Sequence, residues 1–491
     1  MKKFLIDTLF ITAGGFVNRV KGLLFIPVII GALGMDAYGA FIQIFVTIKL
    51  AKAFSSMDLG QGFQRFASVF EKSERRQLGT HFYTIMLASV VMGSLGVLLH
   101  LVLSPWMSGL FFEGKFVEVI QLASVIMLSE TLYSNANKFY LARKQFKLYS
   151  LINLLYDLVP YLMFVLGIVL HRSLYMGILF YAVTDMAVAL LTVGLAARMV
   201  TVAAPSRELL GTYFTYSGPL MLSEVEGGLL DKVDRYFISA IMGLEALGIY
   251  NIIYRICSLL DFVTTPIRKQ MMSYLPKAWD QGYQTESVTA IRHSLLLFLL
   301  ITFGMLGAMT AYFTEILTYL TGDQVTVEYL YLNVVLLGLG ILASGAKRFY
   351  YILVKLKGTT MDQLWYQLAG LIPNIVLNWL LIPHIGILGA SISTFVSYIL
   401  ILLVINYRYD LGIDLSFWGH VVSFSLMAGV MYLIRTWVVV PDGVMLLLVS
   451  LGLSTLVYIG LIVATKRKFL LGMRQSLEAF RLIKKQAETT A

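Results

Sequence analysis

The sequence predicts an all-α polytopic membrane protein with about fourteen transmembrane helices. The 491-residue chain is 58% hydrophobic, only 13% charged, and has a mean hydropathy of +0.79. Soluble domains carry roughly 25% charged residues. Apolar runs of about 20 residues recur along the chain, each long enough to cross a hydrocarbon core as a helix. The runs are continuous rather than alternating, which favours helices over the strands of a membrane barrel.

Fourteen segments are long and apolar enough to be expected spans. Their limits are 4–32, 38–57, 80–103, 116–138, 149–170, 174–197, 210–242, 246–267, 293–319, 327–346, 362–381, 385–405, 417–434 and 444–464. The first and seventh exceed the length that one crossing requires, which predicts a tilt or a bend.

The distribution of basic residues predicts the orientation. With the N-terminus inside, about 28 of the 38 Lys and Arg residues fall in cytoplasmic segments. Only Lys115, Arg172 and Arg435 fall on the opposite side, and the remainder lie within spans. Both termini are therefore expected in the cytoplasm. The net charge of +10 has this origin and does not indicate nucleic-acid binding.

Signatures of an enzyme or a metal protein are absent from the sequence. The single cysteine, Cys257, excludes an intramolecular disulfide, and the six histidines show no metal-ligand spacing. Neither a Walker A pattern nor G-x-S-x-G occurs. The expected outer loops are also too short to hold a catalytic domain. We therefore expect no catalytic activity, no resident metal and no cofactor.

An internal repeat indicates how the chain is organised. ALGMDAYGAF (32–41) aligns with IMGLEALGIY (241–250), which places Gly34 opposite Gly243. GILFYAVTDM (177–186) pairs more weakly with GASISTFVSY (389–398). The repeat predicts two six-helix lobes, 1–203 and 204–408, followed by two helices and a basic tail in 409–491. Parallel repeats are typical of secondary transporters, whose substrate site lies between the halves near mid-membrane.

Ionisable residues within spans are the candidate functional groups. Each costs roughly 2.5 kcal/mol or more at the membrane centre, so it is expected to face a cavity or a partner. The basic candidates are Arg19, Lys52 and Arg255, in the first, second and eighth expected spans. The fifth and sixth spans contain Asp157 and Asp185.

The seventh expected span gathers charges in SEVEGGLLDKVDRYFISAIMG (223–243). Those that would share one stripe of a continuous helix are Glu224, Asp231, Asp234 and Arg235. Asp231 and Arg235 could pair at a spacing of four residues. Pro219 and Gly227–Gly228 predict the bend in this long helix.

Three interpretations of these charges remain open. Ion pairs could latch the two lobes. Alternatively, Arg19, Lys52 and Arg255 could bind a phosphate-bearing ligand. A third possibility is that carboxylates hold a coupling proton or Na⁺; the candidates for this role are Glu224, Asp231, Asp157 and Asp185.

Four segments carry a family resemblance. They are NRVKGLLFIPVIIGALGMDAYGAF (18–41), DLGQGFQRF (58–66), DKVDRYFISAIMGLEALGIYNIIYRI (231–256) and HIGILGASISTF (384–395). In this order they resemble the polysaccharide transporter family (O-antigen or lipid-linked oligosaccharide flippases) of the multidrug/oligosaccharidyl-lipid/polysaccharide exporter superfamily. The resemblance covers essentially the whole chain.

The resemblance implies a V-shaped pair of lobes with alternating access. The implied cargo is a polyprenyl-pyrophosphate-linked oligosaccharide, moved to the outer leaflet of the bacterial inner membrane with Na⁺, H⁺ or the membrane potential as driving force. Partners would be this substrate, membrane lipid and polysaccharide polymerase or assembly proteins. Related lipid II flippases carry cavity arginines on helices 1, 2 and 8, which match Arg19, Lys52 and Arg255. Lys52 departs from that pattern because lysine lacks the bidentate fork.

Coupling or gating is then assigned to the charges of the seventh span: Glu224, Asp231, Asp234 and Arg235. The main alternative is a cation-coupled multidrug antiporter of the same superfamily, whose cavity would be acidic and aromatic. A membrane glycosyltransferase or polymerase is a weaker alternative, because the outer loops are short. A non-transporting scaffold of an assembly complex is a further one.

Overall fold

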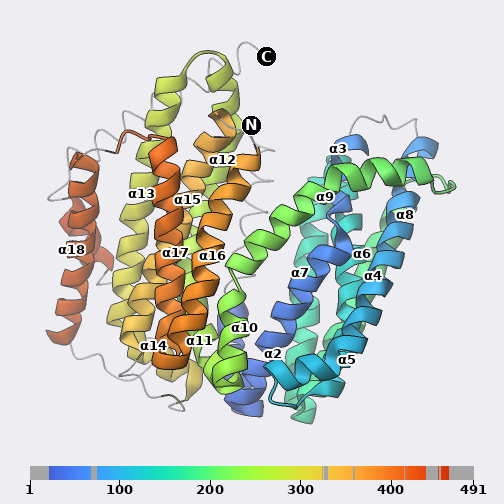
Figure 1. Cartoon of the computed structure of the whole chain (residues 1–491), viewed down its shortest axis with the longest axis horizontal. Coiled ribbons are helices and arrows are strands. Elements are labelled where there is room, and N and C mark those ends of the chain that lie inside the picture. The colour runs from blue at the N-terminus through green and yellow to red at the C-terminus, as the bar shows by residue number, and fades with distance from the viewer. Residues whose placement is uncertain are drawn as a thin grey trace. The chain divides into compact units, whose positions relative to one another are not determined.

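The computed structural model describes residues 21–67, 75–322, 325, 330–357, 360–413, 415–437, 452 and 455–463. Within these residues the chain is built of helices, and no strand occurs (Figure 1). The predicted all-α class is confirmed. Contacts divide the chain into two units, Met1–Asn251 and Ile252–Ala491, and the boundary falls inside one helix, α11 (Leu244–Cys257).

The first unit contains the helices up to the beginning of α11. They are α2 (Ile26–Ser56), α3 (Leu59–Ala67), α4 (Arg75–Phe111), α5 (Val117–Ala123), α6 (Val125–Ala142), α7 (Phe146–His171), α8 (Leu174–Ala197), α9 (Arg207–Leu230) and α10 (Val233–Met242). The second unit contains η1 (Ser258–Phe262), α12 (Thr264–Asp280), α13 (Gln284–Ala311), α14 (Phe313–Thr321), α15 (Tyr331–Lys357), α16 (Thr360–Ile385), α17 (Ile387–Arg408) and α18 (Leu415–Trp437).

Ten helical segments of the described chain are long and apolar enough to cross a membrane. They correspond to ten of the fourteen expected spans. Of the other four, 4–32 and 444–464 lie mostly outside the described residues. Span 210–242 is divided between α9 and α10, and 417–434 corresponds to the shorter apolar helix Ser416–Val430.

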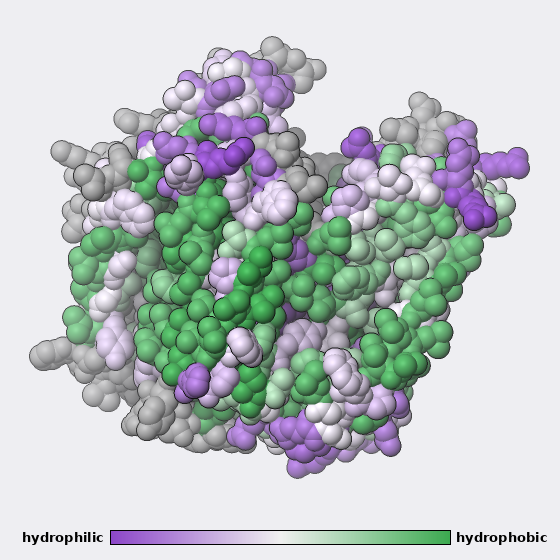
Figure 2. Space-filling view, in the orientation of Figure 1, coloured by the Kyte–Doolittle hydropathy of each residue, from purple (hydrophilic) through white to green (hydrophobic). Residues whose placement is uncertain are grey.

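Packing in the first unit follows from aromatic and small residues on the inner faces of its helices. Phe63, Phe82 and Phe139 are at most 2% exposed and belong to one cluster shared by α3, α4 and α6. On the outer face of α4, by contrast, Leu99 and Val102 are 61% and 76% exposed. Apolar side chains cover the middle of each unit on the face in Figure 2, while polar ones gather at its ends. Such a surface suits lipid rather than water.

In the second unit, α13 and α15 are the central helices. About 72% of the apolar window of each is buried, against 28% for α16. α15 packs against α13 and α17, α16 packs against α17, and α18 covers α13. The exposed side of α16 carries Trp365 and Trp379, each 64% exposed.

Two glycines interrupt the helices at positions that the repeat makes equivalent. Gly34 lies within α2 and has φ 82° and ψ 173°. Gly243 lies between α10 and α11 and has φ 88° and ψ −180°. A residue with a Cβ rarely adopts this conformation. Matching positions of the repeat therefore have matching backbone conformations, and Gly34 separates the expected spans 4–32 and 38–57.

Candidate functional site

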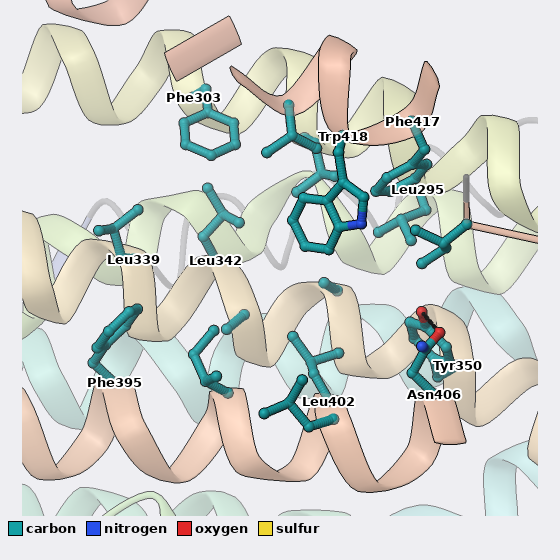
Figure 3. A pocket seen from close by; sticks show the side chains of 17 residues that line it. Leu295, Phe303, Leu339, Leu342, Tyr350, Phe395, Leu402, Asn406, Phe417 and Trp418 are labelled. Atoms are coloured by element: carbon teal, nitrogen blue, oxygen red, sulfur yellow. Dashed lines mark hydrogen bonds between the residues drawn. The ribbon is translucent and has the colours of Figure 1, made fainter. Parts of the chain in front are cut away.

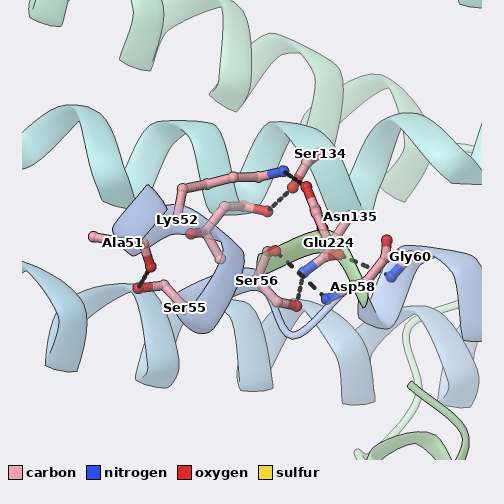
Figure 4. Close-up of polar contacts among 10 residues, drawn as sticks. Ala51, Lys52, Ser55, Ser56, Asp58, Gly60, Ser134, Asn135 and Glu224 are labelled. Carbon is pink, nitrogen blue, oxygen red and sulfur yellow. Dashed lines mark hydrogen bonds and ion pairs between the residues drawn. The ribbon is translucent and has the colours of Figure 1, made fainter. Parts of the chain in front are cut away.

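The end of α2 carries an ion pair between two predicted functional residues. Lys52 Nζ lies 3.5 Å from Glu224 Oε1, which projects from α9 (Figure 4). The side chains are 19% and 42% exposed. A lysine beside low-dielectric surroundings is stabilised by a nearby carboxylate, and both groups belong to the first unit. Lys52, predicted to bind substrate, and Glu224, predicted to act in coupling or gating, thus neutralise each other's charge in this structure.

The turn that follows Lys52 is held in an unusual conformation. Met57 and Asp58 both have positive φ, 44° and 47°. Asn135 of α6 fixes the turn from the side, because its Oδ1 accepts from Gly60 N at 2.8 Å and its Nδ2 donates to Ser56 O at 3.3 Å. Non-glycine residues in the left-handed region are strained and persist where their surroundings hold them.

Asp58 adds a third charge beside this ion pair. Burial and then the charge of Glu224 raise the pKa of the Asp58 carboxyl to about 6, while Lys138 and Lys52 oppose the rise. Its backbone carbonyl accepts from Ser217 Oγ of α9 at 3.2 Å. We refer to Lys52, Asp58, Lys138 and Glu224 as the Lys52 cluster. It joins the end of α2 to α6 and α9.

The charges at the junction of α9 and α10 form a second cluster. Arg235 and Asp234 are 5% and 3% exposed, and Arg235 Nη1 lies 3.5 Å from Asp234 Oδ1. Arg235 Nη1 also donates to the Asp231 carbonyl at 2.6 Å, and the Tyr250 hydroxyl donates to Asp234 Oδ2. Arg235 thereby caps the end of α9 while compensating a buried carboxylate.

The single helical stripe predicted for this segment is wrong. The helix breaks at Asp231 and Lys232, where Lys232 has φ −140°, so Glu224 and Asp234 lie on different helices. Pro219 and Gly227–Gly228, the predicted bend points, lie within α9. Arg235 contacts the Asp231 backbone carbonyl at the predicted spacing and also forms an ion pair with Asp234. The break falls where Arg235 can satisfy the last carbonyls of α9.

The two copies of the repeated motif contact each other within the first unit. Gly39 of α2 lies against the Leu244 carbonyl, and Gly248 of α11 lies against the Met35 carbonyl. Asn251 Nδ2 donates to the Tyr38 hydroxyl at 2.8 Å beside them. Small residues allow backbones to approach this closely. We refer to this contact as the α2–α11 crossing.

A surface ion pair borders the crossing. Glu113 accepts a hydrogen bond from Leu244 N at 3.3 Å, at the positive end of α11, and binds Lys115 Nζ at 2.8 Å. The hydrogen bond from Lys115, and then that from Leu244, lower the pKa of the Glu113 carboxyl. Lys115 also lies 3.8 Å from Asp36. These contacts join the loop after α4 to both copies of the motif.

Of the other two predicted cations, only Arg255 is described. It is half-buried near the end of α11, in the second unit, and its guanidinium makes no ion pair with any described residue. Arg19 lies outside the described residues. Because Lys52 belongs to the first unit, the grouping of Arg19, Lys52 and Arg255 stays a prediction.

The second unit contains an apolar cavity of about 310 Å³ between α13, α15, α17 and α18 (Figure 3). Leu295, Phe303, Phe395 and Trp418 are among its walls. At one end the Tyr350 hydroxyl donates to Asn406 Oδ1 at 2.7 Å, so the polar groups satisfy each other. The cavity suits a hydrocarbon chain rather than a sugar or a phosphate. In the described part of the chain no group of three acidic, histidine or cysteine residues could hold a metal ion.

These features define a polytopic all-α membrane protein. The structure resembles that of the lipid II flippase MurJ in an inward closed conformation, with a TM-score of 0.75 at 13% identity. The match covers 94% of this chain and 99% of that one. An inward-facing MATE multidrug transporter matches with a TM-score of 0.56 at 16% identity, over 82% of this chain and 94% of that chain. A MOP superfamily transporter from Pyrococcus furiosus gives 0.55 at 14% identity over the same shares.

The sequence pattern of the family described as polysaccharide biosynthesis protein matches residues 4–271, and the chain belongs to this family. No curated protein sequence matches the chain significantly. Each of these structural neighbours is named as a flippase or a transporter rather than as an enzyme, in agreement with the prediction that the chain is not an enzyme. The predicted resemblance is confirmed.

Proposed function

We propose that this protein is a lipid-linked oligosaccharide flippase. It moves a polyprenyl-pyrophosphate-linked repeat unit, of O-antigen or another surface polysaccharide, from the cytoplasmic to the outer leaflet of the bacterial inner membrane. Membership of the polysaccharide biosynthesis family over residues 4–271 carries the proposal. An alternating-access cycle, driven by an ion gradient or the membrane potential, moves the headgroup, and both termini face the cytoplasm.

The chemistry of the cargo explains why such a protein is needed. A pyrophosphate and its sugars cannot enter hydrocarbon without a large desolvation cost, so they require a polar, cationic path. Arg255 supplies a guanidinium without an ion-pair partner among the described residues. Guanidinium binds phosphate through paired hydrogen bonds. The apolar cavity of the second unit offers a surface for a lipid chain.

Lys52 enters this mechanism in a different way. Its ammonium already pairs with Glu224, so a phosphate would have to replace that carboxylate. Exchange of one anion for another around Lys52 would free Glu224 and loosen the contact of α2 with α9. Substrate binding and gating would then be coupled through one lysine.

Reconstitution tests the proposal. A fluorescent polyprenyl-pyrophosphate oligosaccharide is placed in the inner leaflet of proteoliposomes, and its arrival in the outer leaflet is measured. We expect Arg255→Ala to slow transfer about 10- to 100-fold, the loss of one or two charge-assisted hydrogen bonds. Arg255→Lys, which keeps the positive charge, should slow transfer less than Arg255→Ala does. Arg207→Ala, an exposed arginine at the start of α9, is the matched control and should transfer normally.

Two other outcomes would contradict the proposal. Movement of a cationic dye without movement of the lipid-linked sugar would identify a multidrug antiporter instead. Elongation of the saccharide in the same vesicles would identify a glycosyltransferase or polymerase. Equal rates for the unmodified protein and Arg255→Ala would remove Arg255 from the substrate site.

A further inference from the structure

Asp185 is a fully buried carboxyl group that the proposed substrate path does not use. It lies near the middle of α8 and is 0% exposed. It makes no ion pair with any described Lys, Arg or His. An unpaired buried charge in a membrane helix is expensive, so such a group is expected either to be neutral or to have a function.

The contacts of Asp185 are all made by one of its two oxygens. Oδ2 is hydrogen-bonded to Ser129 Oγ of α6, and Tyr156 OH of α7 donates to it at 3.2 Å. Oδ1 has no hydrogen-bond partner among the described residues. An ionised carboxylate spreads its charge over both oxygens, so solvating only one of them is a poor environment for it.

Counting hydrogens at Ser129 favours the protonated acid. The hydroxyl has one hydrogen but two acceptors within reach, Asp185 Oδ2 and the Ile126 carbonyl at 3.0 Å. With an ionised Asp185, one of the two acceptors would go without that hydrogen. A proton on Asp185 Oδ2 satisfies both, because the acid donates to Ser129 Oγ and Ser129 donates to Ile126.

The neighbouring ionisable groups also favour a neutral Asp185. Glu130, half-buried on α6, acts on Asp185 with like charge. On α7, Asp157 is a further carboxyl, and its backbone carbonyl accepts from Lys21. The phenols of Tyr133, Tyr156 and Tyr181, one on each of α6, α7 and α8, also lie within electrostatic reach of Asp185.

Two further helices, α2 and α5, pack against α8. Their described charges are Asp36, Lys49, Lys52 and Glu118. Asp36 and Lys52 are held in the ion pairs described above, and Lys49 and Glu118 are exposed. No charge on these helices therefore forms an ion pair with Asp185.

A row of polar groups connects Asp185 with the ends of α6 and α7. The ring of Tyr156 stacks on that of Tyr133 with centroids 3.4 Å apart, and Tyr133 OH donates to Asn153 Oδ1 at 2.7 Å. Asn137 donates to the same oxygen at 3.0 Å. Asn153 and Asn137 lie within two turns of the α6–α7 connection, which is predicted to be cytoplasmic. The buried acid thus lies at the inner end of a polar route.

We propose that Asp185 is a proton-binding site of the first unit and that its proton is exchanged once in each transport cycle. When the packing around α8 loosens, the carboxyl O–H bond breaks, the proton passes to water in the polar route, and the Ser129 and Tyr156 hydroxyls donate to the resulting carboxylate. The exchange in a cycle rests on the proposed flippase function, whereas proton binding itself does not.

Infrared spectroscopy of the purified protein tests the proton-binding site directly. At neutral pH the protein should show the C=O stretch of a protonated carboxyl group. Asp185→Asn, which keeps the shape and the acceptor oxygen, should lose that band. Glu118→Gln, an exposed carboxylate on α5, is the matched control and should retain it. A band that is absent in the unmodified protein, or unchanged in Asp185→Asn, overturns the site.

Transport in the same vesicles tests the coupling. A transmembrane pH difference should accelerate transfer of the lipid-linked oligosaccharide by the unmodified protein several-fold and leave Asp185→Asn unchanged. Transfer by the unmodified protein that ignores the pH difference, or that follows a Na⁺ gradient at constant pH, overturns the coupling. If the unmodified protein transfers no lipid-linked oligosaccharide, the proposed flippase function is wrong, and so is the exchange of the Asp185 proton in each cycle. The infrared band would still show whether Asp185 binds a proton.

Discussion

Gly39 lies so close to Leu244 that a Cβ atom on the glycine would fall 1.9 Å from the Leu244 carbonyl oxygen. The contact has a reciprocal partner, because a Cβ on Gly248 would meet the Met35 carbonyl oxygen at 3.0 Å. In the repeat, Leu244 is the counterpart of Met35 and Gly248 is the counterpart of Gly39. Such an exchange of equivalent contacts is the signature of a two-fold relation. The two copies of the duplicated motif therefore pack against each other through equivalent residues.

Enlarging Gly39 should open the α2–α11 crossing. We expect Gly39→Val to destabilise the protein by at least about 1–3 kcal/mol, because backbone rather than a flexible side chain opposes the new atoms. Thermal unfolding of the detergent-solubilised protein provides the measurement. Gly31→Ala on the same helix is the control, since nothing lies within 4 Å of its added Cβ. Equal melting temperatures for the two variants would show that the crossing is not closely packed in solution.

The repeat illustrates what sequence alone could predict. Gly34 and Gly243 were paired by sequence, and the structure gives them nearly the same backbone angles. The apolar runs likewise predicted ten spans that the structure contains, because span length is set by the membrane and composition is enough to detect it. The repeat and the apolar runs can both be recognised from the order of residues along the chain. They require no knowledge of which helices pack together.

The position of the α9–α10 break was not predictable in the same way. Proline and glycine pointed to residues 219 and 227–228, yet α9 continues through them to Leu230. The break depends on Arg235, Asp234 and Tyr250, and Tyr250 lies on another helix. The pairing of Lys52 with Glu224 joins residues far apart in the sequence. Asn135, which fixes the turn after α2, has no sequence signal that distinguishes it. The helix break, the Lys52–Glu224 pair and the turn after α2 are all determined by contacts between residues far apart in the sequence.

The buried pair at the α9–α10 junction predicts a large loss of stability. Asp234→Asn would remove the negative charge of the Asp234–Arg235 pair in a site where both side chains are at most 5% exposed. Breaking a buried pair in this way costs about 3–5 kcal/mol. Tyr250→Phe removes the hydrogen bond from the hydroxyl to the same carboxylate but keeps the charge pair, and should cost about 1–3 kcal/mol. Denaturant unfolding measures both, and a loss in Asp234→Asn no larger than in Tyr250→Phe would contradict the assignment.

The Lys52–Glu224 pair should contribute far less. Because Glu224 is 42% exposed, the coupling energy in a double-mutant cycle of Lys52→Ala and Glu224→Ala should be about 0.2–1 kcal/mol. The swapped variant Lys52→Glu/Glu224→Lys should recover most of the stability but transport poorly, since the cation would move from α2 to α9. Unfolding and transfer assays on the same preparations separate the two effects. Normal transfer by the swapped variant would exclude a role for the position of this lysine.

Asp58 predicts how stability depends on pH. Folding raises the pKa of this carboxyl from its ordinary 3.8 to about 6, first through burial and then through Glu224. Protonation therefore favours the folded state: the contribution of Asp58 is fully present below about pH 4 and is lost as the pH rises through about 6. Asp58→Asn should flatten this part of the profile of melting temperature against pH, measured between about pH 4 and pH 7.

Glu224→Gln distinguishes the two causes of that shift. Removing the Glu224 charge should move the midpoint of the Asp58 step to lower pH while leaving the step present, because burial is the larger cause. Asp280→Asn, at the end of α12 in the second unit, is a control that should leave the midpoint in place. A step that disappears in Glu224→Gln would make the Glu224 charge the dominant cause. A step that persists in Asp58→Asn would assign the titration to another group.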